Sequence, residues 1–92
     1  MNWHVIVSAG ISQAIGRCGL SRQGLVRVLV AVHVKLSAIA NALRPHRDPI
    51  DQDFFLYHFA LWDSGAFHTL EFRVNDVSAP GFLFIVRLKH TV

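Results

Sequence analysis

Apolar and polar residues alternate through most of the second half of the chain, which is the pattern of half-buried β-strands. Three segments show it: 54–62, which is strongly aromatic, 67–76 and 82–90. Between the first two segments, Ser64-Gly65 has the composition of the central pair of a hairpin turn. Residues 77–81 contain proline and glycine and are expected to form the next loop. The pattern predicts three antiparallel strands.

The first half of the chain follows a helical period instead. Apolar residues recur at spacings of three and four along one stripe, at Leu25, Leu29, Val32, Leu36, Ile39 and Leu43. Ser21 is positioned to cap this helix at its N-terminus, and Pro45 ends it. Valines crowd the same segment and favour a strand locally, but the length and the stripe outweigh that weak propensity. We expect this helix to cover one face of the sheet.

Two shorter elements precede the main helix. Ser12 is the expected cap of a short helix that runs through Cys18 and is closed by Gly19. The Val-Ile-Val run at residues 5–7 is either a first strand or an extended lead-in. The expected fold is one α+β domain over residues 1–92, in which a short N-terminal strand and one or two helices pack on a three-stranded antiparallel C-terminal sheet.

Counting outward from the two turns gives the expected strand register. The turn at Ser64-Gly65 pairs Tyr57 with Phe72. Across the second hairpin, the expected pairs are Val74 with Phe84, Phe72 with Val86, Leu70 with Leu88 and His68 with His90. All of these residues share one face of the sheet. That face is almost wholly apolar, so we expect it to lie beneath the helix.

The opposite face carries a cross-strand row of a base, an acid and a cation, namely His58, Glu71 and Arg87. Arg73 and Lys89 are expected beside this row. Such a row is suited to phosphate chemistry, with His58 or Glu71 as the base and Arg87 as the phosphate clamp. The alternative is a surface ion pair between Glu71 and Arg87, worth under about 1 kcal/mol, with a histidine next to it. A slip of one residue in either hairpin would remove the row.

Two further histidines, His68 and His90, are expected at the open end of the apolar face. They either offer two ligands to a metal ion or are partly buried and hydrogen-bonded side chains. His90 is also a candidate acid for the row on the other face, if the end of its strand twists. Two ligands are too few for a predicted metal site, and we expect no cofactor.

The composition limits the class of protein and its cellular location. Of the 92 residues, 52% are hydrophobic and 16% are charged, which excludes a disordered chain. This is more apolar than a lone small domain needs, so we expect part of the surface to meet a partner or a second copy. Cys18 is the only cysteine, which excludes an internal disulfide and favours a cytoplasmic location. Arg27, His33 and Lys35 interrupt the most apolar stretch and argue against a membrane span.

A net charge of +3 permits contact with nucleic acid or with an acidic protein. Arg44 and Arg47, on either side of His46, follow the predicted helix directly. They either grip phosphate or satisfy the dipole at the helix C-terminus. Together with Arg73 and Lys89 they are the candidate nucleic-acid-binding residues. The sequence contains no Gly-rich phosphate loop, no GxSxG and no HExxH, so no motif specifies an activity by itself.

The order of segments, a strand, two helices and three antiparallel strands, resembles the RelE/ParE toxin superfamily of bacterial toxin–antitoxin modules. The likeness of the second half lies in the layout of Arg44-Pro45-His46-Arg47-Asp48-Pro49 and the three strands 54–62, 68–76 and 82–90. In the RNA-cleaving branch, Arg, Lys, His and sometimes Glu act on the open sheet face. By position, Glu71, Arg87 and His90 correspond. His68-Thr69 stands where that family often has an aromatic–Arg pair.

This resemblance implies a toxin or toxin-like protein that acts on RNA or the ribosome as a metal-independent endoribonuclease and is neutralised by an antitoxin protein. Two other functions remain open from the residues themselves. One is a non-catalytic interaction module that dimerises through its apolar surface. The other is a sheet that binds nucleic acid without hydrolysing it.

Overall fold

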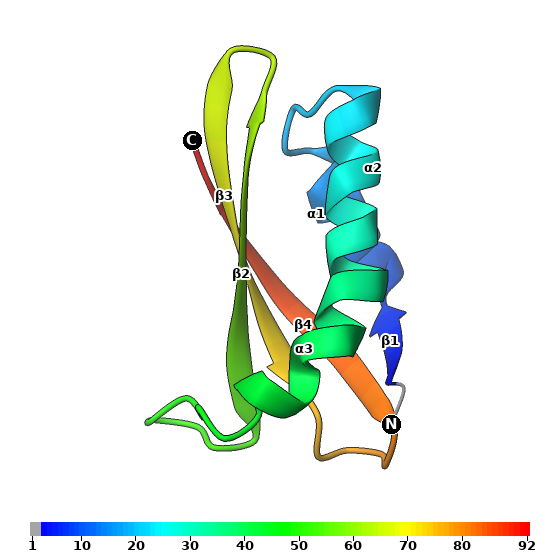
Figure 1. Cartoon of the computed structure of the whole chain (residues 1–92), viewed down its shortest axis with the longest axis vertical. Coiled ribbons are helices and arrows are strands. Elements are labelled where there is room, and N and C mark those ends of the chain that lie inside the picture. Colours follow the sequence, from blue (N-terminus) through cyan, green and yellow to red (C-terminus); the bar gives the residue numbers. More distant parts are fainter. Residues whose placement is uncertain (1–2) are drawn as a thin grey trace.

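A four-stranded sheet and a helical layer on one side of it make up residues 3–92, the part of the chain that the computed structural model describes (Figure 1). The elements in chain order are β1 His4–Val7, α1 Ala9–Gly16, α2 Arg22–Val30, η1 Ala31–Lys35, α3 Leu36–Leu43, β2 Phe54–Asp63, β3 Ala66–Asn75 and β4 Phe82–Thr91. The α+β class predicted from the sequence is confirmed.

The sheet has one strand more than predicted, and it is mixed. Its strand order is β1-β4-β3-β2, and β1 runs parallel to β4, with Val5 paired to Leu83. The predicted N-terminal strand and the three predicted antiparallel strands are all present, but β1 is part of the sheet, so the prediction of a three-stranded, wholly antiparallel sheet is wrong on that point. Parallel pairing joins segments that are far apart in the chain, and here the helices and the first hairpin all lie between β1 and β4, so no local turn in the sequence indicates this pairing.

The first hairpin has the register that its turn predicts. All pairs counted from the turn are present, from Asp63 with Ala66 to Phe54 with Asn75. Ser64 and Gly65 both have positive φ angles, 52° and 80°. Positive φ at both central residues is the two-residue turn whose twist matches the strands it joins. The turn therefore sets which side chains of β2 and β3 share a face.

The second hairpin differs from the prediction by one residue next to the turn, where Phe84 was expected opposite Val74, and by one more residue beyond a β-bulge in β4. Next to the turn Val74 pairs with Ile85, and beyond it Arg73 pairs with Arg87, so Val86 is the extra residue. A bulge shifts all later pairs along the partner strand. The predicted pairs across this hairpin are accordingly wrong, and the observed ones are Glu71 with Lys89, Phe72 with Leu88 and Leu70 with His90.

The predicted helices are present with changed details. Ser21 caps α2, and its hydroxyl accepts a hydrogen bond from the Gly24 N–H, as expected. The short helix α1 is capped by Ser8 rather than Ser12. The helical run α2–η1–α3 presents a different stripe to the sheet from the predicted one. Val32 and Leu36 are fully buried, but Leu29 and Ile39 are 38% and 42% exposed.

The cause is the π-helical turn η1 in the middle of this run. In an α-helix a four-residue step overshoots one turn by about 40°, so a stripe at every fourth residue would drift off the core. The wider turn, in which Leu36 N–H bonds back to the Ala31 carbonyl, removes part of that drift. The same carbonyl accepts a hydrogen bond from the buried Tyr57 hydroxyl at 3.1 Å. The buried stripe is Gly24, Val28, Ala31, Val32, Leu36 and Ala40.

The hairpin end of β2 is fastened to the start of α2. The buried Asp63 carboxylate accepts hydrogen bonds from the N–H and the hydroxyl of Ser21, the first at 2.7 Å. These bonds hold the pKa of Asp63 below its usual value. A Cβ atom on Gly24 would collide with this carboxylate. The glycine is therefore required by the close approach of the helix to the hairpin.

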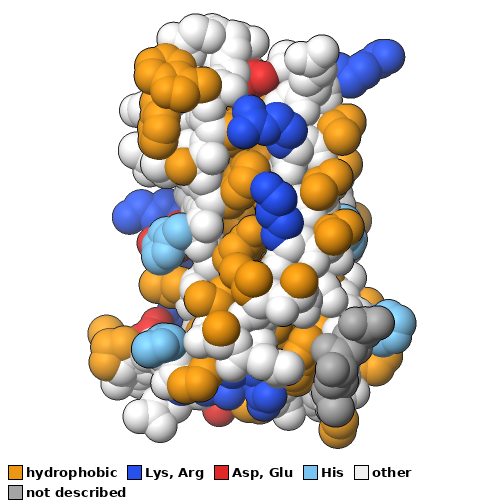
Figure 2. Space-filling model, in the orientation of Figure 1, with side chains coloured by type: hydrophobic (Ala, Val, Ile, Leu, Met, Phe, Trp, Pro, Cys, Tyr) orange, Lys and Arg blue, Asp and Glu red, His pale blue; other side chains and the backbone are white. Residues whose placement is uncertain are grey.

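The helical run Arg22–Leu43 is long and apolar enough to cross a membrane by length and composition alone. In the fold its inner side packs on the sheet, while apolar side chains also line its outer side (Figure 2). The exposed ones are Val26, Leu29, Val30, Val34 and Ile39. A surface helix normally presents charged and polar residues there. This outer side is called the apolar helix face below.

Candidate functional site

A shallow pocket of about 210 Å³ lies on the outer face of the sheet, the face that the helices leave uncovered. The residues that line it are Leu56, Glu71, Arg73, Arg87 and Lys89. They come from β2, β3 and β4, and strand alternation turns them all to the same side. Three cations and one carboxylate thus surround a space large enough for a small anionic group.

His58 stands beside this pocket and is bonded to its only carboxylate. His58 Nε2 lies 3.0 Å from Glu71 Oε2, and the two residues are direct partners across the hairpin. An ionised carboxylate only accepts hydrogen bonds, so Nε2 carries the proton in the neutral imidazole. Nδ1 then has a free lone pair. Two-thirds of the His58 side chain is exposed, so this atom is accessible to a ligand.

Arg73 is held rigidly and is partly neutralised. Its guanidinium donates to Asp48 at 2.9 Å, lies 3.7 Å from an Asp51 oxygen and stacks 4.4 Å from the Phe54 ring centroid. Backbone N–H groups of Ile50 and Asp51 and then Arg73 itself lower the pKa of Asp48, which keeps that partner charged. Arg73 therefore sits at the pocket with a fixed orientation.

Arg87 and Lys89 have no such partner: neither forms an ion pair with any residue in the range 3–92. The one-residue shift next to the turn and the β-bulge together place Arg87 opposite Arg73, and Lys89 takes the place opposite Glu71 that was predicted for Arg87. The row is thus His58–Glu71–Lys89. Like charges directly opposite on a sheet repel, so Arg73 and Arg87 together favour an anion between them.

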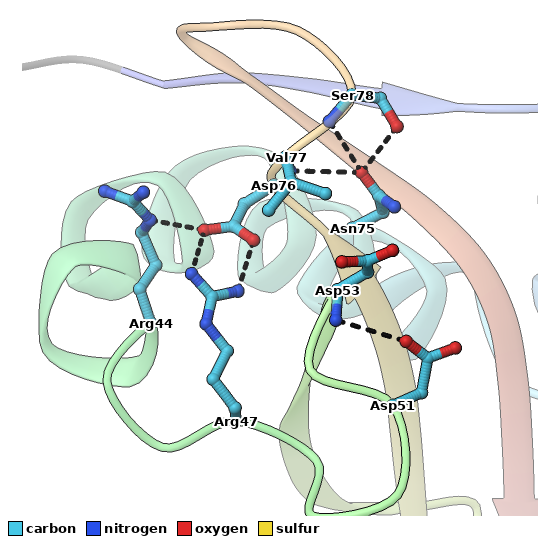
Figure 3. A network of polar contacts seen from close by, with 8 residues as sticks. All are labelled: Arg44, Arg47, Asp51, Asp53, Asn75, Asp76, Val77 and Ser78. Carbon is cyan, nitrogen blue, oxygen red and sulfur yellow. Dashed lines mark hydrogen bonds and ion pairs between the residues drawn. The ribbon is translucent and has the colours of Figure 1, made fainter.

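The two remaining candidate phosphate ligands lie elsewhere. Arg44 and Arg47 both donate to the carboxylate of Asp76, whose side chain is fully buried (Figure 3). Burial works to raise the pKa of Asp76, but the hydrogen bonds and charges of Arg47 and Arg44 outweigh it and the pKa is lowered. Arg44 also stacks on Trp3, 4.7 Å from its ring. The structure thus separates these two arginines from the pocket and gives their charges an internal partner.

His90 is likewise outside the pocket. It faces the helix side of the sheet, where its Nε2 lies 2.9 Å from Nδ1 of the buried His68 and the rings stack. Burial and then the neighbouring His68 lower the pKa of His90. The two histidines meet as expected, although the bulge makes them diagonal rather than direct partners. No third His, Cys, Asp or Glu joins them into a metal-binding group within the described part of the chain.

Sequence reasoning missed the acids that partner the arginines. Asp76 follows β3 and Asp48 lies in the connection before β2, and neither was a candidate. Asp48 lies within four residues of Arg44 and Arg47 but pairs with Arg73 instead, so its place in the chain did not indicate its partner. The long-range pairing with Asp76 carries no local signal.

Comparisons of the chain with protein-family models, with curated proteins and with solved structures return no match. The candidate site therefore rests on the chemistry and geometry of its own residues.

Proposed function

We propose that the outer sheet face binds the phosphate backbone of RNA and that the protein is a RelE/ParE-like toxin or toxin-like protein, a metal-independent endoribonuclease of the cytoplasm. The observation that carries the proposal is the excess of cations around the pocket. Three cations, Arg73, Arg87 and Lys89, line the pocket with one carboxylate, that of Glu71. Among the three, only Arg73 forms ion pairs with other acids within residues 3–92. The order of elements on which the resemblance rests is also that of the fold.

Phosphate binding falls to Arg87 and Lys89. Guanidinium matches two phosphate oxygens at once, and the ammonium adds a point charge. Arg73, fixed by Asp48, extends the positive field along the same face. Backbone phosphate contacts give affinity without sequence preference, so binding should weaken steeply with salt.

Cleavage falls to His58 and the groups beside it. Nδ1 of His58 takes the proton of a ribose 2′-hydroxyl, and Glu71 orients the ring and stabilises the imidazolium that results. The 2′-oxygen forms a bond to phosphorus while the bond from phosphorus to the 5′-oxygen breaks. Arg87 stabilises the charge that develops on the phosphate oxygens. The Lys89 ammonium, opposite Glu71, gives a proton to the leaving oxygen.

The test is a titration with a fluorescent single-stranded RNA, comparing wild type with Arg87→Ala. We expect the variant to bind at least about tenfold more weakly and to lose about one unit of the salt slope. Arg17→Ala is the matched control, since Arg17 is an exposed arginine that ends α1 and forms no ion pair within residues 3–92. Equal affinity of the two variants would contradict the proposal.

Cleavage is tested separately with His58→Gln, which keeps a polar side chain but removes the base. We expect RNA binding to persist and cleavage to be lost. In bacteria, expression of wild type should arrest growth, and Arg87→Ala should not. Binding without cleavage by wild type would leave the third function, a non-hydrolytic binder of nucleic acid.

The alternative function, a non-catalytic interaction module, is favoured by the apolar helix face. Val34 is 61% exposed and Val26 is 53% exposed in the middle of a hydrophobic stripe. If this face binds a second copy or another protein, Val34→Ser should weaken that complex and leave RNA binding unchanged. A folded wild type that neither binds RNA nor arrests growth would favour this function.

A further inference from the structure

Two aromatic side chains lie on the outer sheet face at the end where the β2–β3 hairpin closes. Trp62 on β2 and Phe67 on β3 are direct partners across the hairpin, and their rings meet edge to face, with centroids 5.7 Å apart at 83°. Strand alternation turns both to the side of His58 and Glu71. These two residues, called the hairpin aromatic pair below, therefore share one face of the sheet with the pocket.

The hairpin aromatic pair is open to solvent. Trp62 is 65% exposed and Phe67 is 46% exposed. Strand β4 ends at Thr91, opposite Thr69, so the hairpin extends past it and β4 does not flank the pair (Figure 1). An edge-to-face contact covers an edge of one ring and a face of the other, so flat aromatic surface is left uncovered. Such surface favours a ligand that stacks on it.

The other aromatic rings on the outer face are covered to a greater extent. Phe54 carries the Arg73 guanidinium 4.4 Å from its ring centroid. Phe82 stacks on Phe84 with centroids 6.3 Å apart, and the His4 ring packs on Phe82 at 5.5 Å. Within residues 3–92, the hairpin aromatic pair is therefore the most exposed aromatic surface of this face.

Small side chains separate the hairpin aromatic pair from the pocket. Ala60, Thr69 and Thr91 form one row across β2, β3 and β4, next to the row that contains Glu71 and Lys89. All three are exposed and too small to obstruct a chain that lies flat on the sheet. From Glu71 to the pair the face runs for four residues of extended strand, or about 14 Å. About four nucleotides stacked at about 3.4 Å cover that length.

We propose that the hairpin aromatic pair stacks on an unpaired base of the RNA whose phosphates the pocket binds, so that the site takes single-stranded RNA. This inference rests on the proposed function, because the cations of the pocket hold the strand against the sheet. Bases in a duplex stack on one another and have free faces only at its ends, whereas unpaired bases stack on aromatic side chains. The pair therefore adds affinity for a single strand alone.

Charge complementarity supports RNA as the occupant of this face. Arg87 and Lys89 form no ion pair within residues 3–92, and both lie on the side of the sheet to which the aromatic rings point. Cations that track the backbone, together with aromatic rings that receive bases, are the combination by which proteins bind single strands without sequence preference. An apolar partner would cover the rings but leave the cations without counter-charges.

The first experiment measures the affinity of wild type and Trp62→Ala for an oligo(U) of about eight nucleotides and for an RNA duplex of about sixteen base pairs. We expect the variant to bind oligo(U) about tenfold more weakly, the loss of one stacked base, and to bind the duplex as wild type does. The salt slope for oligo(U) should stay the same, because no phosphate contact is removed. Val34→Ala, an exposed apolar position on the apolar helix face, is the control and should bind both RNAs as wild type does.

The second experiment follows the stacking itself by tryptophan fluorescence. The chain has two tryptophans, and Trp3 is buried, so a base reaches only Trp62. We expect oligo(U) to quench part of the emission of wild type. Trp62→Phe keeps an aromatic ring and should bind oligo(U) within about twofold of wild type, but without this quenching. This variant also provides a test if Trp62→Ala does not fold.

Three results would overturn the inference: equal affinity of wild type and Trp62→Ala for oligo(U), an equal loss for oligo(U) and the duplex, and no quenching of wild type at saturation. Emission that changes with protein concentration alone would place a second copy on the hairpin aromatic pair instead. If Arg87→Ala weakens binding and Trp62→Ala does not, only this inference fails. A wild type that binds no RNA would contradict the proposed function as well.

Discussion

The two faces of strand β3 differ in what surrounds them. Leu70, Phe72 and Val74 point to the helices and are 1%, 0% and 0% exposed, whereas Glu71 and Arg73 between them point to the open face. Substituting an inner residue removes packing contacts, because protein interiors are close-packed and contain few voids. Each outer residue can be exchanged without disturbing a neighbour in the core. The inner face therefore sets stability, and the outer face is free to concentrate cations.

The sharpest test of this contrast is Leu36→Ala, because Leu36 is fully buried against the inner face. We expect a loss of about 2–5 kcal/mol in the free energy of unfolding, from lost burial and the cavity left behind. Val34→Ala, two residues away on the apolar helix face, should cost under about 0.5 kcal/mol. Denaturant titration measures both. Equal losses would mean that the helix does not present this side to the sheet.

A second test uses two glycines in helices. Replacing a helical glycine by alanine ordinarily stabilises a protein by about 0.5–1 kcal/mol. Gly16→Ala should do so, since no atom lies within 4 Å of the added Cβ apart from its chain neighbours and the backbone of its own helix. Gly24→Ala should instead destabilise by about 1–3 kcal/mol, because its Cβ collides with the Asp63 carboxylate. Stabilisation by both, in thermal melting, would show that the hairpin does not approach α2 so closely.

The inner face also predicts a pH dependence of the melting temperature. Asp63 and Asp76 have lowered pKa values in the fold, so their stabilisation is present above the pKa of an unfolded carboxyl and is lost as the pH falls through the folded value. We expect the main drop below about pH 4. In Asp76→Asn, which cannot titrate, this drop should be smaller. An unchanged profile would contradict the lowered pKa.

His90 should add a smaller and earlier decline. Its pKa is lowered in the fold, so the neutral form is favoured and stability falls as the pH drops below about 6.5, the usual histidine value. His90→Gln should remove this first step and keep the one below about pH 4. A first step that survives in the variant would have to come from another histidine.

The smallest expected effect on stability belongs to the outer face. Arg87→Ala and Lys89→Ala remove exposed cations without ion-pair partners in the described chain, so each should change the free energy of unfolding by less than about 0.5 kcal/mol. A loss above about 1 kcal/mol, measured by denaturant titration, would mean that these cations serve the fold. The contrast between the faces would then break down.

The two hairpins show how far sequence reasoning reaches. The residues Ser64 and Gly65 indicate a two-residue turn, and this turn alone determines every pair between β2 and β3, including His58 with Glu71. The loop at residues 77–81 is longer, and nothing local marks Val86 as a bulge. Half of the site was therefore predicted correctly, and the half that depends on β4 was displaced along the strand by two residues.

The predictions of the buried helix stripe and of two phosphate-binding arginines were wrong for a related reason. The stripe with Leu29 and Ile39 assumed an uninterrupted α-helix, whereas a hydrogen bond from Tyr57 on β2 accompanies a wider turn. Arg44 and Arg47 looked available for phosphate until Asp76, about thirty residues later in the chain, joined them. Both errors concern contacts between distant segments, which spacing within one segment does not encode.

The π-helical turn η1 also changes how the chain should respond to length mutations. It acts as an inserted residue that sets α2 and α3 in different rotational phases, each matched to its own part of the sheet. Deleting one residue between 31 and 35 would turn this wide turn into an ordinary α-helical turn, so the residues after it would keep nearly the same side toward the sheet. Leu36 and Ala40 would then stay in the core, whereas the same deletion within α2 would rotate the residues that follow by about 100°. The length of the wide turn is therefore under looser constraint than the length of the α-helix before it.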